Sequence, residues 1–257
     1  MSCFRFVAAV VCSFSLLLGP TIARQQSASS PYPSALIQQS LAAFGNLPSD
    51  SSALGSVSIV AGSEAEVGSI QIQTRGVDQS SEQVTASSGS TQTIFSHGAA
   101  ALSVSGKKSL SSLELTASSQ TALFPFPLLA YFAGSSDSAY QYVGTETVNG
   151  TACQHIRVWK TFASQPDMQY LASFTARDIW LDSTTNLPLK IAYSVRAGTG
   201  AVPTISVEIF YSGYQLVNGV QYPFLISKSL NGTPWMDITI SSVSFNTGLT
   251  DSSFPLR

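Results

Sequence analysis

The sequence predicts a mainly β (α+β) protein, in which a curved antiparallel meander sheet has its apolar face covered by one or two helices. Three Asn-Gly dipeptides, at 149–150, 218–219 and 231–232, lie between segments in which apolar and polar residues alternate. Asn-Gly in this setting is the strongest short-range signal for a two-residue hairpin turn. Because the alternation leaves one face of each strand polar, only the other face needs a cover.

The strands are clearest in the C-terminal half of the chain. Segment 140–148, Asn149-Gly150 and segment 151–159 form a predicted hairpin with a type I′ turn. In a later segment Ile191 and Tyr193 point to one side and Lys190 to the other. The remaining strands predicted here are 178–182, 189–195, 204–211, 222–229 and 236–243.

The N-terminal half begins with one predicted helix and continues as strands. After Pro33, apolar residues recur at helical spacing up to Phe44, and Gly45-Asn46 ends the pattern. The period then changes to two, which predicts short strands. These strands lie around 57–59, 67–72, 82–86, 91–96 and 100–105.

Segment 123–132 breaks the alternation, because it is continuously apolar and aromatic and contains two prolines. Central strands do not accommodate proline, so residues 127–132 are predicted as a short helix with proline in its first turn. The segment carries more apolar area than one short helix needs. It is either a lid over a ligand cavity or a plug that fills the core. The candidate ligand-binding residues are Phe124, Phe126, Leu128, Leu129, Tyr131 and Phe132.

The N-terminus predicts export. Arg5 precedes an apolar run from Phe6 to Leu18 that is too short to span a bilayer, and Thr21-Ile22-Ala23 suits a signal peptidase. Residues 1–23 are therefore expected to be a signal peptide, with an uncleaved anchor as the alternative. Residues 24–33 are expected to be a disordered tether and 34–257 a single domain. The mature chain should be periplasmic or secreted, with no lipobox and no transmembrane segment.

Composition narrows the classes of partner. The chain has 12 basic and 14 acidic residues, and its 10% charged content compares with about 25% in ordinary proteins. No nucleic-acid partner is expected from this balance. Cys153 is the one cysteine outside the predicted signal peptide, so it is expected to be a buried, inert thiol.

Signatures of catalysis are missing from the sequence, which contains no H-E-x-x-H, G-x-S-x-G, Walker or C-x-x-C motif. His97 and His155 together with Asp178 or Asp182 would be a metal site only if they met in space, and surface or strand-paired histidines are favoured. Asp182 is expected to accept backbone hydrogen bonds in a turn. Asp178 is expected to pair across the sheet, with Arg157 or Lys190. No catalytic residue, metal or cofactor is predicted, although an enzyme assembled from scattered residues stays an alternative.

Several short motifs, in this order, resemble the LolA/LolB lipoprotein-carrier superfamily. They are residues 142–150, 179–182 with 186–189, 219–223 and 238–254. The resemblance implies an unclosed β half-barrel wrapped on helices, whose concave apolar face holds acyl chains without covalent chemistry.

By this resemblance the chain would be a non-enzymatic periplasmic binding or carrier module. Its ligand would be apolar or amphipathic, such as a lipid or the acyl chain of a lipoprotein, and a monomer is expected. The chain departs from the superfamily pattern in its Ser-rich N-terminal strands and in having no lipobox, and no functional arginine is carried over. The alternative is a structural or protein-interaction module of the cell envelope with a filled core.

Overall fold

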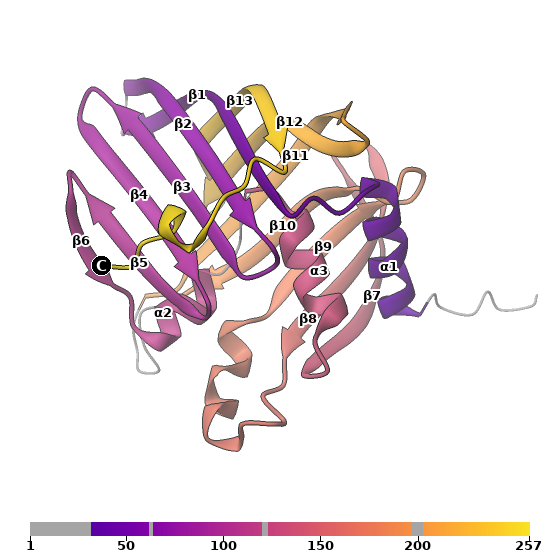
Figure 1. Cartoon of the computed structure of the whole chain (residues 1–257). Coiled ribbons are helices and arrows are strands. Elements are labelled where there is room, and N and C mark those ends of the chain that lie inside the picture. The colour runs from indigo at the N-terminus through magenta and orange to yellow at the C-terminus, as the bar shows by residue number, and fades with distance from the viewer. Residues whose placement is uncertain (1–31, 62–63, 120–122, 197–202) are drawn as a thin grey trace, which may run out of the picture. The chain divides into compact units, whose positions relative to one another are not determined.

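Figure 1 shows the computed structural model, which describes residues 32–61, 64–119, 123–196 and 203–257. The predicted signal peptide and most of the predicted tether lie outside these residues. The strands are β1 (Asp50–Ala61), β2 (Glu64–Arg75), β3 (Gln79–Ala86), β4 (Gly89–Ser96), β5 (Ala99–Val104), β6 (Lys107–Leu110), β7 (Ser138–Val148), β8 (Thr151–Lys160), β9 (Arg177–Asp182), β10 (Pro188–Val195), β11 (Ile205–Val217), β12 (Val220–Leu230) and β13 (Thr233–Phe245).

Within the described residues these strands form one curved antiparallel sheet of 13 strands. Its order is β6-β5-β4-β3-β2-β1-β13-β12-β11-β10-β9-β8-β7, so every pair except β1–β13 joins strands that follow each other in the chain. The edge strands β6 and β7 do not pair with each other in this order, and the half-barrel stays open. The predicted antiparallel meander and unclosed half-barrel are confirmed.

The hairpin turns explain why the meander was predictable. Asn149 and Gly150 have φ values of 49° and 83°, and the other two Asn-Gly pairs have the same signs. Type I′ turns need positive φ at both positions, which Asn and Gly tolerate best. His97-Gly98 and Ser105-Gly106 adopt the same backbone signs. Because His and Ser are weaker turn signals, the hairpin that adds β6 was not predicted.

The helical elements are α1 (Pro33–Phe44), α2 (Leu113–Ser119), α3 (Phe126–Gly134) and the 3-10 segments η1 (Pro166–Phe174) and η2 (Asp251–Ser253). The predictions that gave α1 and α3 are confirmed, with α3 one residue longer at its start and two at its end. Neither α2 nor η1 was predicted. Both are short and lack a clear apolar period, so packing decides their conformation.

The end of α1 is fixed against the turn between β11 and β12. Gly45 has a φ of 93° and forms an isolated bridge with Val220. A Cβ atom at position 45 would lie 2.2 Å from the carbonyl oxygen of Gly219. Glycine is therefore required here both for the backbone conformation and for the close approach.

The main core lies between the inner face of the sheet and the helices α1 and α3. Phe44 of α1 packs edge-on against Phe126, with ring centroids 5.1 Å apart, and Phe124 stacks on Tyr222 of β12 at 4.4 Å. All four rings are buried. We call these four residues the aromatic cluster, and it fills one end of the inner face.

The C-terminal segment covers part of the outer face. Figure 1 shows it crossing in front of the N-terminal strands, and Phe254 within it is 2% exposed. The buried Asp50 carboxylate anchors its start by accepting hydrogen bonds from the Thr247 and Gly248 amides at 2.7 and 3.0 Å. Burial alone would raise the pKa of Asp50, but these hydrogen bonds lower it. No helix in the described part of the chain is long and apolar enough to cross a membrane.

Candidate ligand-binding site

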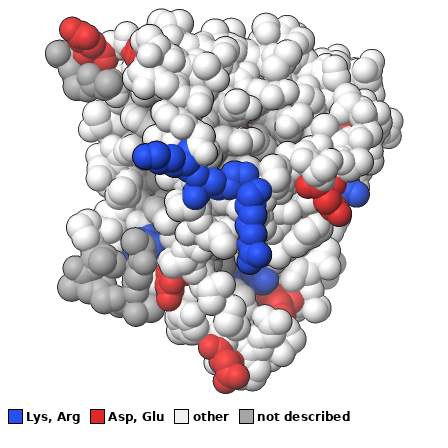
Figure 2. All heavy atoms as spheres, turned by 60° about the vertical axis from the view of Figure 1, so that its left-hand side comes forward, with Lys and Arg blue, Asp and Glu red and all other residues white. Residues whose placement is uncertain are grey.

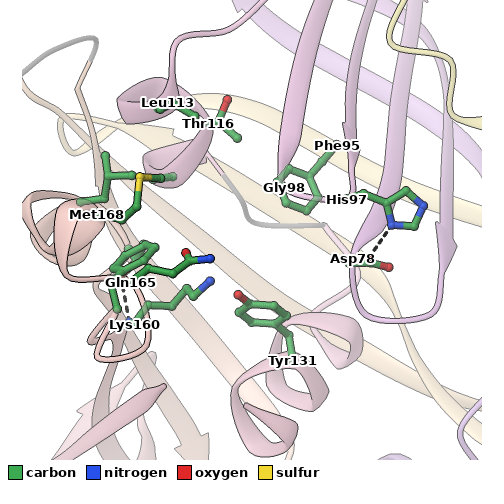
Figure 3. Close-up of a pocket in the computed structure, with 14 residues that line it drawn as sticks. Asp78, Phe95, His97, Gly98, Leu113, Thr116, Tyr131, Lys160, Gln165 and Met168 are labelled. Atoms are coloured by element: carbon green, nitrogen blue, oxygen red, sulfur yellow. Dashed lines mark hydrogen bonds and ion pairs between the residues drawn. The ribbon is translucent and has the colours of Figure 1, made fainter. Parts of the chain in front are cut away.

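Among the cavities on the inner face of the half-barrel, two larger ones lie next to each other. We call the first the Tyr131 cavity; it has a volume of about 370 Å³ and is shown in Figure 3. It lies among the β2–β3 and β4–β5 turns, α2, α3 and η1. Its lining residues are Asp78, Phe95, His97, Gly98, Leu113, Thr116, Ala117, Tyr131, Lys160, Phe162, Gln165, Met168, Leu171 and Thr175.

A lysine and an aromatic ring define the chemistry of the Tyr131 cavity. The Lys160 ammonium lies 5.3 Å from the ring centroid of Tyr131 and 4.8 Å from that of Phe162. In Figure 3 Lys160, Gln165 and Tyr131 point their polar ends toward the same space, while Met168 borders it. The cavity therefore combines apolar and polar walls, and the polar ends of these three side chains converge in it.

The second cavity, which we call the Trp235 groove, has a volume of about 250 Å³. Phe95 lines both cavities, so the groove and the Tyr131 cavity are neighbours along β4. The apolar lining of the groove comes mainly from β10 to β13. Its lining residues are Ser80, Glu82, Thr93, Phe95, Ser119, Tyr193, Val195, Ile205, Val207, Lys228, Leu230 and Trp235.

Two charged residues lie on the apolar face within this groove. Glu82 is opposite Ile72 in the sheet, and Lys228 is opposite Met236. Burial raises the pKa of Glu82, an effect that the positive charge of Lys228 partly opposes. The Glu82 Oε1 atom accepts a hydrogen bond of 3.0 Å from the Leu123 amide. The groove therefore combines an apolar wall with one carboxyl group and one ammonium group.

Sequence reasoning did not single out Glu82 or Lys228. The signal was present in the alternation, because Lys228 stands in the same phase as Ile226 and Leu230, which face the core. Charged residues in the apolar phase of a strand are uncommon and are frequently functional.

The predicted site residues fall mostly in the core. Phe124, Phe126, Leu128, Leu129 and Phe132 are each at most 5% exposed. Tyr131 is half-buried and is the one among the six candidates that lines a described cavity. That these six residues contact a ligand stays a prediction.

Arg177 is a further charged residue of the inner face, and it holds two helical elements on the sheet. Its guanidinium donates to the carbonyl oxygens of Ala117 and Ser118 in α2, both at 3.0 Å, and to that of Phe174 in η1 at 3.1 Å. The residue is 1% exposed, and burial lowers its pKa to about 10. Arg177 therefore positions α2 and η1, which both contribute to the Tyr131 cavity.

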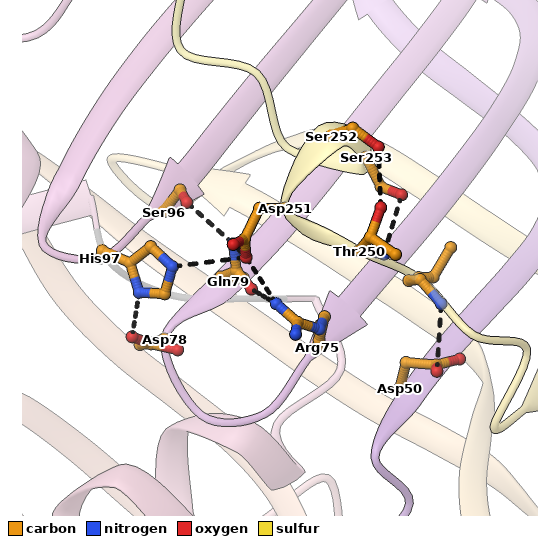
Figure 4. A network of polar contacts seen from close by, with 11 residues as sticks. Asp50, Arg75, Asp78, Gln79, Ser96, His97, Thr250, Asp251, Ser252 and Ser253 are labelled. Atoms are coloured by element: carbon orange, nitrogen blue, oxygen red, sulfur yellow. Dashed lines mark hydrogen bonds and ion pairs between the residues drawn. The ribbon is translucent and has the colours of Figure 1, made fainter.

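His97 belongs to a polar network that ties the C-terminal segment to the outer face, as Figure 4 shows. Its Nδ1 atom is 2.7 Å from Asp78, and Asp251 of η2 lies 3.6 Å from its Nε2 atom. Asp251 also accepts from Arg75 at 2.6 Å and from Gln79 at 3.2 Å. The hydrogen bond with Asp78 is the largest of the causes that raise the pKa of His97. These contacts give His97 a structural role.

His155 forms a separate network on the outer face. Its Nδ1 atom is 2.7 Å from Glu146 and its Nε2 atom 3.0 Å from Asp178, while its ring stacks on Trp180 at 4.1 Å. Both ring nitrogens therefore face carboxylates, which confirms a strand-paired histidine. Asp178 also pairs with Arg157 at 3.7 Å, as predicted.

Other predicted polar and thiol roles are also confirmed. The carboxylate of Asp182 accepts from the Thr184 amide at 2.7 Å, which confirms its role in the turn. Cys153 is buried, and burial raises the pKa of its thiol, so it is poorly reactive. Across the described ranges, no group of three or more His, Cys, Asp and Glu side chains could hold a metal ion.

The outer surface near the edge strand β6 is mostly uncharged. Figure 2 brings forward the side that carries β5, β6 and the chain's C-terminus, and on it the most prominent group of Lys and Arg side chains forms one strip, with smaller basic areas elsewhere. Strand β6 contributes Lys107, which is exposed, and Lys108, which donates to the Pro255 carbonyl oxygen at 2.7 Å. Lys108 therefore helps to hold the C-terminal segment on the sheet.

Comparison with known proteins shows which fold the chain has. No family model matches the chain, and no curated protein matches it in sequence. Among the similar crystal structures are three with a TM-score of 0.56 each. They are a protein described as an outer-membrane lipoprotein-sorting protein domain from Vibrio parahaemolyticus (15% identity, 86% of this chain and 95% of that one), a DUF1329 family protein from Desulfovibrio piger ATCC 29098 (14%, 86% and 95%) and a LolA superfamily protein from Nitrosomonas europaea (13%, 88% and 98%).

These similarities cover nearly the whole length of each relative at low sequence identity, so they concern the fold. The chain has a LolA-like fold, as the resemblance in its sequence implied.

Proposed function

We propose that this protein is a non-enzymatic periplasmic binding or carrier module for an apolar or amphipathic ligand, such as a lipid or the acyl chain of a lipoprotein. The observation that carries the proposal is the pair of neighbouring cavities on the inner face of an open half-barrel. Half of the residues that line the Tyr131 cavity and more than half of those that line the Trp235 groove are apolar or aromatic, and polar groups converge in each, which is typical of sites for small ligands. Binding would need no covalent chemistry.

Two further findings support this function. The fold is shared with a protein described as a lipoprotein-sorting domain and with a LolA superfamily protein. The predicted signal peptide would export the chain to the periplasm, where amphipathic molecules need shelter from water. We therefore propose the periplasm as its location and a monomer as its working form.

In this proposal α3 forms one wall of the site. Tyr131 would contact the ligand directly, whereas Phe124, Phe126, Leu128, Leu129 and Phe132 would hold α3 on the sheet and reach the ligand only if α3 moves. Tyr131 should therefore be replaceable without unfolding the protein, while the buried residues should not. The first distinction that an experiment must make is thus between lost folding and lost binding.

The test is a titration of the purified protein with a neutral fluorescent probe such as N-phenyl-1-naphthylamine, combined with native mass spectrometry of co-purified lipid. We expect saturable binding that Trp235→Asp weakens at least tenfold, because a carboxylate in the groove opposes apolar contact. Val67→Asp is the matched control, since Val67 is 71% exposed and should leave binding unchanged.

Absence of both probe binding and co-purified lipid would contradict the proposal. It would favour the alternative of an envelope interaction module, for which the tightly packed aromatic cluster is the supporting observation. Equal loss of binding in the two variants would place the probe outside the groove and would also count against the site.

A further inference from the structure

The inner face of the Trp235 groove contains an ammonium group in apolar surroundings. Lys228 stands on β12 between Ile209 of β11 and Met236 of β13, both buried in the main core. Its ammonium lies 5.0 Å from the ring centroid of Trp235. Cation–π contact of this kind stabilises a cation in a partly dry site but supplies no acceptor for its three hydrogen-bond donors.

No carboxylate in the described part of the chain lies within ion-pair distance of Lys228. The carboxylates that pair with basic groups are Asp78, Glu146, Asp178, Glu208 and Asp251, and each pairs with a residue other than Lys228. The neighbouring Glu82 lines the same groove, but its described hydrogen bond is with the Leu123 amide. Lys228 acts electrostatically on Glu82 but makes no ion pair with it, so the half-buried ammonium can still attract an anion from solution.

We propose that the Trp235 groove binds a single-chain amphiphile by its carboxylate head, with the Lys228 ammonium as the ion-pair partner. The hydrocarbon chain would lie along Val195, Val207 and Leu230 of the groove wall. This inference rests on the proposed function and specifies the class of ligand.

Glu82 explains why the head should carry a single negative charge. Its carboxyl group lines the same groove and already accepts a hydrogen bond from the Leu123 amide, while burial raises its pKa. A phosphate dianion would place a second negative charge beside this carboxyl group with only one lysine to balance it. A carboxylate therefore fits the pair better than a phosphate.

Selectivity of the wild-type protein is the first test. The neutral probe is displaced by dodecanoate, dodecanol, dodecyl phosphate and dodecyltrimethylammonium in parallel titrations below their micelle concentrations. We expect dodecanoate to bind about tenfold or more tightly than dodecanol, as a charge-assisted hydrogen bond in a partly dry site provides. Equal affinity for these two ligands, or a preference for the phosphate or the ammonium ligand, would overturn the inference.

Variants of Lys228 test whether this residue causes the preference for dodecanoate. Lys228→Gln should bring dodecanoate affinity to that of dodecanol and leave dodecanol unchanged, and Lys228→Arg should retain the preference. Lys107→Gln on the exposed edge strand β6 removes the same charge outside the groove and should have no effect. Circular dichroism and a urea titration check that each variant is folded.

The two proposals fail in different ways. If wild-type protein binds neither the probe nor any of the four ligands, the proposed function fails and this inference fails with it. If it binds them but Lys228→Gln keeps the preference for dodecanoate, only the assignment of the head group to Lys228 is wrong.

Discussion

The two ends of the inner face differ in what occupies them. At one end α1 and α3 place the aromatic cluster of Phe44, Phe124, Phe126 and Tyr222 directly on the sheet, and all four rings are buried. At the other end Lys228 and Trp235 are half-buried and border a groove of about 250 Å³. The same sheet is therefore filled at one end and hollow at the other, and the difference lies in side-chain type.

The comparison teaches how one half-barrel can be both stable and open. Large rings packed edge-on and stacked supply the burial that stabilises the fold. Glu82 and Lys228 stand in the apolar phase of their strands and border the open groove. Charged groups that must stay near water or a ligand keep that end open.

The largest expected effect is on the filled end. Phe124→Ala should lower the free energy of unfolding by about 3–5 kcal/mol, because it removes a fully buried ring and leaves a cavity. Trp235→Ala should cost markedly less, since its ring is half-buried beside the groove. Urea denaturation measures both, and equal costs would contradict the division into a filled and an open end.

The second prediction concerns the attachment of α2 and η1. Arg177→Met should lower the free energy of unfolding by about 3 kcal/mol or more, because it leaves buried carbonyl oxygens of both elements without donors. Arg177→Lys should be intermediate, since lysine has fewer donors and no planar fork. Hydrogen exchange should show faster exchange in α2 and η1 first; uniform acceleration over the sheet would argue against local positioning.

A smaller effect is expected at the anchor of the C-terminal segment. Asp50→Asn should cost about 1.5–3 kcal/mol, because the carboxylate accepts charge-assisted hydrogen bonds from the Thr247 and Gly248 amides. The pKa of Asp50 is lowered in the fold, so its contribution is present above pH of about 3.9 and is lost as the pH falls through the folded value. Limited proteolysis of the segment after β13 measures how readily this segment detaches from the sheet. Unchanged protection would rule out this anchor.

How much of this was predictable from sequence depends on where the signal lies. Asn-Gly turns and the alternation around Tyr193 are local, so the meander and its inner face followed from them. The site did not, because the aromatic segment at 123–132 is the strongest apolar signal and fills the core, apart from Tyr131. The pairing of β1 with β13 decides which strands face each other across the groove. This pairing places Glu82 and Lys228 in the same groove although they are 146 positions apart in the chain.

The smallest effect is expected from a change of pH, which alters how strongly the network of His97, Asp78 and Asp251 holds the C-terminal segment on the outer face. The pKa of His97 is raised by Asp78 and Asp251, so its contribution is complete below pH of about 6.5 and is lost as the pH rises through the folded value. The pKa of Asp251 is lowered, so its contribution appears above pH of about 3.9 and is lost as the pH falls through its folded value. Docking of η2 should therefore be strongest between these limits. An NMR titration of the His97 ring that shows no raised pKa would contradict the network.

The most direct test of the open groove uses two of the three tryptophans as reporters. Trp235 lines the groove, whereas Trp180 stacks on His155 on the outer face. With fluorinated tryptophan incorporated, titration with dodecanol should shift the Trp235 resonance saturably and leave that of Trp180 in place. A titration in which neither resonance moves, or in which both move together, would contradict a ligand site on the inner face.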